Sequence, residues 1–208
     1  MLRNSLRIHT RSHHERIEQA LDLPASLRSR DDFERLLARF YGFYLPHEAR
    51  LRSYKSALET YGIELHARLK ADKIRHDLLS LGMSAEEISR LPQCVDLPDL
   101  CTPGHALGSL YVLEGSTLGS QVIARALNQR VDLDIRSGTS FLSGYGASTG
   151  AMWRSFVKAL DAARLETEGV AAAHEGAVQT FDSLERWMSC RGPEKLAASP
   201  SKTRPSPC

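Results

Sequence analysis

Several features that would assign this chain of 208 residues to a common class are missing from it. No window holds about 18 consecutive apolar residues, so we expect no membrane span, and the charged opening segment lacks the apolar middle of a secretory signal. Basic and acidic residues nearly balance, 27 against 25, without the basic patch or run of a nucleic-acid binder. The four cysteines form no CxxC pair, which argues against a zinc ribbon or a disulfide scaffold. We therefore expect a cytoplasmic protein with neither a membrane nor a nucleic-acid partner.

Strand signals are also scarce, because no run shows convincing period-two alternation of Val, Ile and aromatic residues. Helical spacing recurs instead, and 42% apolar residues over this length can form one sizeable core. We predict a single all-α bundle of about seven or eight helices over residues 1–190. Residues 191–208 have little apolar content and closely spaced prolines, so a disordered tail is expected there.

The boundaries of the expected helices come from caps and breakers. Ser29 or Asp31 can cap the second helix, Ser84 begins a short helix in the capping-box pattern, and Pro46 should kink the second helix or divide it in two. A loop rich in glycine and serine is expected over 137–149. The helices are predicted at about 2–21, from 32, 63–80, from 84, 104–129, 149–163 and 166–188.

Histidines gather on the first helix, at positions 9, 13 and 14. On a helical wheel the apolar stripe centres near Ile17, with His13 inside it and His14 at its edge, so periodicity slightly favours His13 and leaves both open. A neutral imidazole on a rigid helix is a good axial ligand for iron. Glu18, one turn after His14, could accept the proton of the other ring nitrogen. The alternative is a surface, capping or hydrogen-bonded core histidine.

Helix 104–129 collects glycine on one face, with Gly108, Gly115 and Gly119 aligned. Each interior glycine costs roughly 1 kcal/mol of helix stability relative to alanine. Such a face suggests that something flat approaches the backbone or that the helix bends. The alternative is close packing of two helices, and the spacing of Gly115 and Gly119 also fits that pattern. Glu114, a charged residue expected to lie deep, stands beside this face.

Two pairs of cations stand one helical turn apart, Arg7 with Arg11 and Arg154 with Lys158. Arginine forks bind carboxylates bidentately, so the two pairs could hold a dianion such as the propionates of a porphyrin. The alternative is a solvated polar face. Other chemistries lack their motifs: no histidine follows a Glu by three residues as in di-iron bundles, and HExxH, GxSxG and the phosphate-binding loops are absent.

Three segments carry a resemblance to a known family. The pattern LRxxTxxxHxxxE of residues 6–18 resembles the proximal helix of heme oxygenases, and GSLYVLEGSTLG of residues 108–119 resembles their distal helix. The segment GYGASTGAMWRSF of residues 144–156 looks like the bacterial branch, particularly enzymes that supply biliverdin to bacterial phytochromes. The similarity runs over residues 2–189 and implies an all-α fold in which heme lies between two helices.

The resemblance also implies roles for particular residues. It carries the axial iron ligand onto His14, because Thr10 and the spacing match there, and it makes Glu18 the partner of that histidine. Gly115 and Gly119 become the distal backbone that bends over the heme.

Basic residues are implied near the propionates, at Arg7 and, on the far helix, at Arg154 and Lys158; the neighbouring Arg11 remains a candidate from spacing. Mammalian-type members carry an Asp after the first distal glycine to support a water network. Ser116 stands there in this chain, as in the bacterial branch, which leaves the route of proton delivery open.

The implied activity is the oxidative opening of heme, both cofactor and substrate, to biliverdin, carbon monoxide and ferrous iron. It consumes dioxygen and electrons, for which the resemblance implies a ferredoxin or flavoprotein reductase as donor and a phytochrome as one recipient of biliverdin. Two alternatives stay open. One is a heme-binding or storage protein without turnover; the other is a helical bundle of another enzyme class or a plain interaction bundle.

Overall fold

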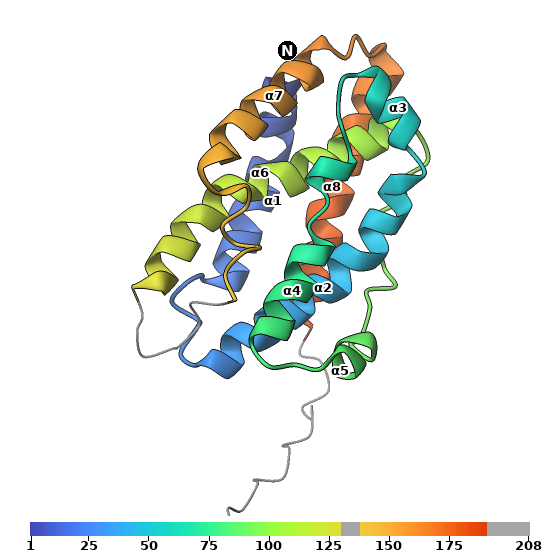
Figure 1. The fold of residues 1–208 in the computed structure, drawn as a ribbon. Helices are drawn as coiled ribbons and strands as arrows, with labels where there is room; N and C mark the ends of the chain where they lie inside the picture. The colour runs from blue at the N-terminus through green and yellow to red at the C-terminus, as the bar shows by residue number, and fades with distance from the viewer. Residues whose placement is uncertain (130–137, 191–208) are drawn as a thin grey trace, which may run out of the picture.

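The computed structural model describes residues 1–129 and 138–190, and within these ranges all regular structure is helical. The predicted all-α bundle is therefore confirmed (Figure 1). No described helix has the length and hydropathy that a membrane span needs. The tail predicted over 191–208 lies outside the described residues. The helices are α1 (Leu2–Leu21), α2 (Arg30–Arg52), α3 (Lys55–Thr60), η1 (His66–Arg68), α4 (Ala71–Ser80), α5 (Ala85–Ser89), α6 (Pro103–Asn128), η3 (Gly146–Ser148), α7 (Thr149–Ala162) and α8 (Thr167–Ser189).

Of the two outcomes expected at Pro46, division of α2 is wrong, because the helix runs unbroken to Arg52; a kink at Pro46 stays a prediction. A proline has no N–H, which leaves the carbonyl four residues earlier without its helical partner. That carbonyl belongs to Gly42, and it accepts instead from the backbone N–H of Cys94 at 2.8 Å. A Cβ at Gly42 would lie 2.3 Å from the Pro92 oxygen, so only glycine at this position lets the chain around Pro92 pack so close to α2. A long-range hydrogen bond thus replaces the one that proline removes.

The helix predicted over 63–80 is also wrong, because the segment is split into η1 and α4. Leu69 between them is extended, with φ −72° and ψ 143°. Glu48 of α2 accepts from the N–H groups of Lys70 (2.6 Å) and Ala71 (3.2 Å). A carboxylate from another helix therefore caps the start of α4, a contact that local periodicity does not reveal.

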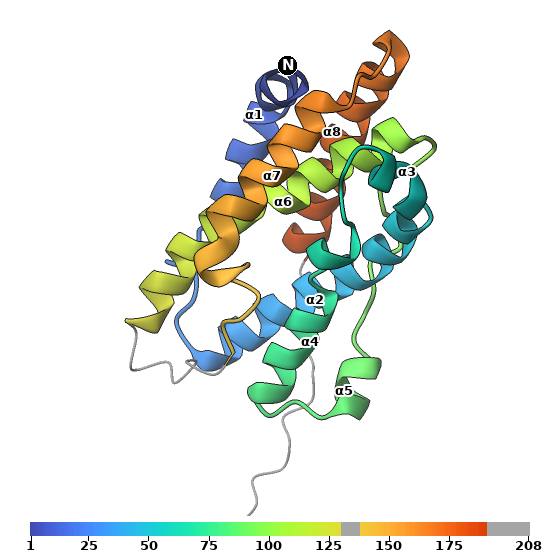
Figure 2. The same ribbon diagram turned by 45° about the horizontal axis from the view of Figure 1, so that its top comes forward.

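The helices pack in two groups, one formed by α1, α6 and α7 and the other by α2 and α4, and α8 contacts both. Helices α1 and α6 each pack against α8 and against α7, while α2 packs against α4 and α8 (Figures 1 and 2). The buried aromatic residues of α2, among them Phe33, Phe43 and Tyr44, form a large part of the core between the groups. Because α1 and α6 rest on the same two neighbours, these neighbours can hold them apart, and a cavity lies between them.

The N-terminal half of α6 crosses α8 at very short range. A Cβ at Gly108 would lie 1.8 Å from the Ala173 oxygen, and one at Gly176 of α8 would lie 2.3 Å from the His105 oxygen. Close helix packing therefore explains Gly108. Gly115 and Gly119, farther along the helix, have no such neighbour.

Candidate functional site

A cavity of ≈ 590 Å³ lies between α1 and α6, within the size range of small-molecule sites. Helices α2, α7 and α8 and the 138–149 loop complete its walls, which are largely apolar. Seven of the nine predicted site residues line it: Arg7, Arg11, His14 and Glu18 from α1, and Gly115, Ser116 and Gly119 from α6.

His14, and not His13, faces this cavity. The Nδ1 atom of His14 lies 3.3 Å from the Glu18 carboxylate, and the ring meets Phe181 of α8 edge-on at 5.9 Å. With Nδ1 turned to Glu18, Nε2 is the nitrogen left for a ligand. His13 instead lies against α8, with Nε2 3.6 Å from Asp182. The slight preference of periodicity for His13 is therefore not matched by the geometry.

The opposite wall is the bare stretch of α6. A Cβ at Gly119 would meet nothing within 4 Å, and one at Gly115 would meet only the Trp153 ring, at 3.9 Å. Among the described residues no helix backbone approaches this face as closely as α8 approaches Gly108, so close helix packing does not account for these two glycines. They leave room for a flat ligand to lie against the backbone.

The cations divide between the cavity and the surface. Arg7 and Arg11 line the cavity, although the Nε of Arg11 also donates to Glu15 at 2.9 Å. Arg154 and Lys158 are exposed on α7 and are not among the residues that line the cavity. The structure therefore brings only one of the two predicted cationic pairs to the site.

Tyr44 of α2 also lines the cavity, although the sequence gives no indication of it. Its hydroxyl lies 3.5 Å from the Ser116 Oγ, which itself donates to the Leu113 carbonyl at 2.9 Å. Burial raises the pKa of the Tyr44 phenol, so it stays protonated and able to donate. The apolar periodicity of α2 gave no signal that this hydroxyl reaches a cavity.

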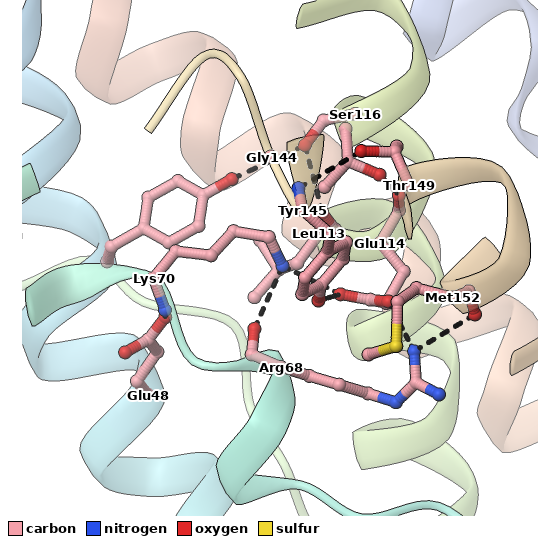
Figure 3. A network of polar contacts seen from close by, with 12 residues as sticks. Glu48, Arg68, Lys70, Leu113, Glu114, Ser116, Gly144, Tyr145, Thr149 and Met152 are labelled. Atoms are coloured by element: carbon pink, nitrogen blue, oxygen red, sulfur yellow. Dashed lines mark hydrogen bonds and ion pairs between the residues drawn. The ribbon is translucent and has the colours of Figure 1, made fainter. Parts of the chain in front are cut away.

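Behind the glycine wall, Glu114 is the centre of a buried ionic cluster (Figure 3). Its carboxylate accepts from Arg68 at 2.5 Å, from Lys70 at 2.7 Å and from the Tyr145 hydroxyl at 2.6 Å. Burial and the Glu114 charge raise the pKa of the Tyr145 phenol, which remains a donor. One carboxylate thus joins η1, the start of α4, the 138–149 loop and α6. The expectation that Glu114 lies deep is correct, and its partners come from segments distant in sequence.

The 138–149 loop forms part of the cavity wall and is held from α4. The Asp77 carboxylate accepts from the N–H groups of Ser140 (3.0 Å) and Phe141 (2.7 Å). Phe141 then lines the cavity and packs against Phe40 and Tyr44, with ring centroids 5.2 and 5.3 Å away. The loop is therefore fixed in the cavity wall.

The fold and the cavity define an all-α protein that can enclose a flat ligand between two helices. The family model described as heme oxygenase matches residues 1–190. A curated relative, Heme oxygenase PigA of Pseudomonas aeruginosa, is 31% identical over 185 residues, covering 87% of this chain and 90% of the relative.

Solved structures agree in fold. A heme oxygenase from Leptospira interrogans aligns with a TM-score of 0.70 at 18% identity, covering 90% of this chain and 98% of that one. A heme oxygenase from Neisseria meningitidis, solved with NO and CO bound, aligns at 0.69 and 20% identity over 99% of each chain. This chain belongs to the heme oxygenase family and is an enzyme of heme degradation. The narrower resemblance to the phytochrome-associated branch stays a prediction.

Proposed function

We propose that this enzyme converts heme to biliverdin, carbon monoxide and ferrous iron, using dioxygen and electrons from a ferredoxin or a flavoprotein reductase. The observation that supports it is the cavity with His14 on one wall and the Gly115–Gly119 backbone on the other. Bound heme supplies the redox chemistry, because the macrocycle is both the cofactor and the molecule that is opened.

His14 is the proposed axial ligand of the heme iron. A thiolate ligand pushes electron density toward iron and so favours cleavage of an O–O bond there. A neutral imidazole lacks this effect. Glu18 lies 3.3 Å from Nδ1 of the ring, where it would accept the Nδ1 proton and so keep the tautomer that presents Nε2 to the metal. Phe181 braces the ring from α8.

Gly115 and Gly119 leave no side chain over the opposite face of the heme. This open backbone would leave room for dioxygen beside the macrocycle. Tyr44 and Ser116 are the hydroxyls of this wall and can hold ordered water or donate a hydrogen bond there. They take the place of the Asp that mammalian-type members carry.

Arg7 and Arg11 are proposed to hold the propionates at their end of the cavity. Arg154 and Lys158 are exposed, so in this proposal they would reach the propionates from the rim or bind the electron donor. An acidic donor protein is expected to dock on this basic side. Transfer of biliverdin to a phytochrome remains a prediction from the resemblance.

Reaction of the purified protein with hemin under reductant in air tests the proposal. The expected result is a Soret band typical of imidazole-ligated heme that decays while biliverdin appears on chromatography. Hemin that binds but survives unchanged would instead identify a heme-binding or storage protein. Hemin that keeps the spectrum of free pigment would exclude a heme site altogether.

A further inference from the structure

We propose that Trp153 is a specificity-determining residue: its indole closes one edge of the heme cavity and so decides which meso carbon is attacked. The proposal rests on the proposed function. Trp153 is the only residue of α7 among those that line the cavity. The α7 edge of the site is therefore defined by a single large side chain.

The indole lies directly beside the bare part of α6. Its Cζ3 and Cη2 atoms are 3.9 Å from the position that a Cβ of residue 115 would occupy, which is ordinary van der Waals contact. One turn along, Gly119 has nothing within that range. The part of the cavity beside these two glycines is thus open at Gly119 and bounded by the Trp153 indole at Gly115. A flat ligand that slid toward α7 would meet the edge of this ring.

The indole of Trp153 has two aromatic neighbours. It packs against Tyr111 and Phe156, with centroids 6.0 and 5.9 Å away. Phe156 is fully buried and carries the Arg68 guanidinium 5.3 Å from its ring centroid. Arg68 in turn pairs with Glu114. The buried ionic cluster therefore acts on the cavity through Phe156, by holding the indole in place.

The porphyrin outline is nearly square, so rotation about the iron–imidazole axis brings a different meso carbon to the same place with little change of shape. The iron position is fixed by His14, and the tilt of the bound gas by the glycine wall. In-plane rotation is then set by contacts at the ring edge. Arg7 and Arg11 act on the propionates at that edge, and Trp153 supplies a rigid stop that an ion pair alone does not.

The first test locates the ring without turnover. Trp153 and Trp187 are the two tryptophans of the chain. Trp187 is an internal control, because it bonds to the Arg39 carbonyl and does not line the cavity. Protein labelled with fluorotryptophan is titrated with zinc protoporphyrin and followed by fluorine NMR, the two signals being assigned with Trp153→Phe and Trp187→Phe. The Trp153 signal should shift while the Trp187 signal stays. An unmoved Trp153 signal in a protein that binds the porphyrin would overturn the proposal.

The second test measures the biliverdin isomers. In Trp153→Ala the ratio of the main isomer to the others should fall by about tenfold or more, since the loss of the ring opens the cavity edge. Trp187→Phe, outside the cavity lining, should keep the wild-type ratio. If the alanine variant does not fold, Trp153→Leu replaces it, with the same loss expected. A variant that has lost the ring, binds hemin and yields the wild-type ratio would contradict the inference. Failure of the wild type to ligate hemin would instead contradict the proposed function.

Discussion

His14 and Glu18 stand one turn apart on α1, with side chains 53% and 65% exposed. A polar contact this exposed contributes little to stability, because water competes for both groups. Its effect is on geometry, since a carboxylate at Nδ1 leaves Nε2 toward the cavity. His13 differs from His14 in this respect, because its Nε2 is turned to Asp182 and not toward the cavity.

Replacement of Tyr44 by Phe tests the hydroxyl in the distal wall. Its one hydrogen bond, to Ser116, is long at 3.5 Å, so folding stability should change little. A distal donor worth about 1 kcal/mol would be lost, and the fluoride affinity of the ferric heme complex should fall about fivefold. Fluoride titration at the Soret band measures this. Unchanged fluoride affinity would show that the Tyr44 hydroxyl does not reach a ligand on the iron.

Residues of the site were predictable to different degrees. The α1 and α6 residues follow helical spacing, so a wheel brings His14, Glu18 and the glycines to definable faces. Periodicity slightly favoured His13 over His14, because the wheel does not show where α8 lies. Tyr44 could not be found at all, since its apolar neighbours on α2 mark it as core and only the tertiary fold brings its hydroxyl near Ser116.

Helix α6 has two halves with different functions, although one glycine face runs through both. Near its start, glycine allows contact with α8; farther along, it faces the cavity. Close packing and ligand approach were alternatives for the glycine face; in the structure Gly108 is packed against α8, while Gly115 and Gly119 line the cavity. Pattern alone cannot separate them, because a glycine under a neighbouring helix and one under an open slot look the same.

Alanine substitution should distinguish the two halves. Gly108→Ala places a Cβ 1.8 Å from the Ala173 oxygen, so the helices must separate, at a cost of about 2 kcal/mol or more. Gly119→Ala meets open space and should stabilise the apoprotein by up to about 1 kcal/mol. Urea unfolding of the apoproteins measures both. Equal effects of the two substitutions would refute the division of α6.

Substitution of Glu114 tests the buried cluster. Glu114→Gln leaves Arg68 and Lys70 buried without a countercharge, and should destabilise the protein by about 3–5 kcal/mol. Glu86→Gln is the matched control, because its pair with Arg90 is exposed and contributes at most about 1 kcal/mol. The free energy of unfolding in urea should separate the two variants clearly. A Glu114 effect as small as that of the control would show that the cluster does not brace the fold.

For the whole molecule, the length and the helical spacing were enough to predict an all-α bundle. The structure differs from the prediction at Pro46, where α2 is not divided, and over residues 63–80, where the predicted helix is split. Both differences have one cause. In both cases a distant partner decides the local structure: Cys94 bonds to the carbonyl that Pro46 leaves free, and Glu48 caps the start of α4. Such partners exist only once the chain is folded.

The stability of the whole molecule should depend on pH through His47. Burial lowers the pKa of this histidine to about 3, and its Nε2 lies 2.7 Å from Ser109. The unfolded chain binds a proton below a pH of about 6.5 that the folded one does not. Stability should therefore be lost as pH falls, by about 1.4 kcal/mol per pH unit. His174, whose pKa is also lowered, adds to the same trend.

Urea unfolding between about pH 6.5 and pH 5 measures this slope. His47→Gln should flatten it, while His76→Gln, at an exposed position, should leave it unchanged. A slope that persists in His47→Gln would assign the acid sensitivity to other groups.

The central claim is that His14 holds heme iron opposite the glycine wall of α6, and the absorption spectrum of the hemin complex in three proteins tests it most directly. Wild type and His13→Ala should show the same imidazole-ligated spectrum, whereas His14→Ala should lose it and regain it on addition of imidazole. An imidazole-type spectrum that persists in His14→Ala, or that disappears in His13→Ala, would contradict the account.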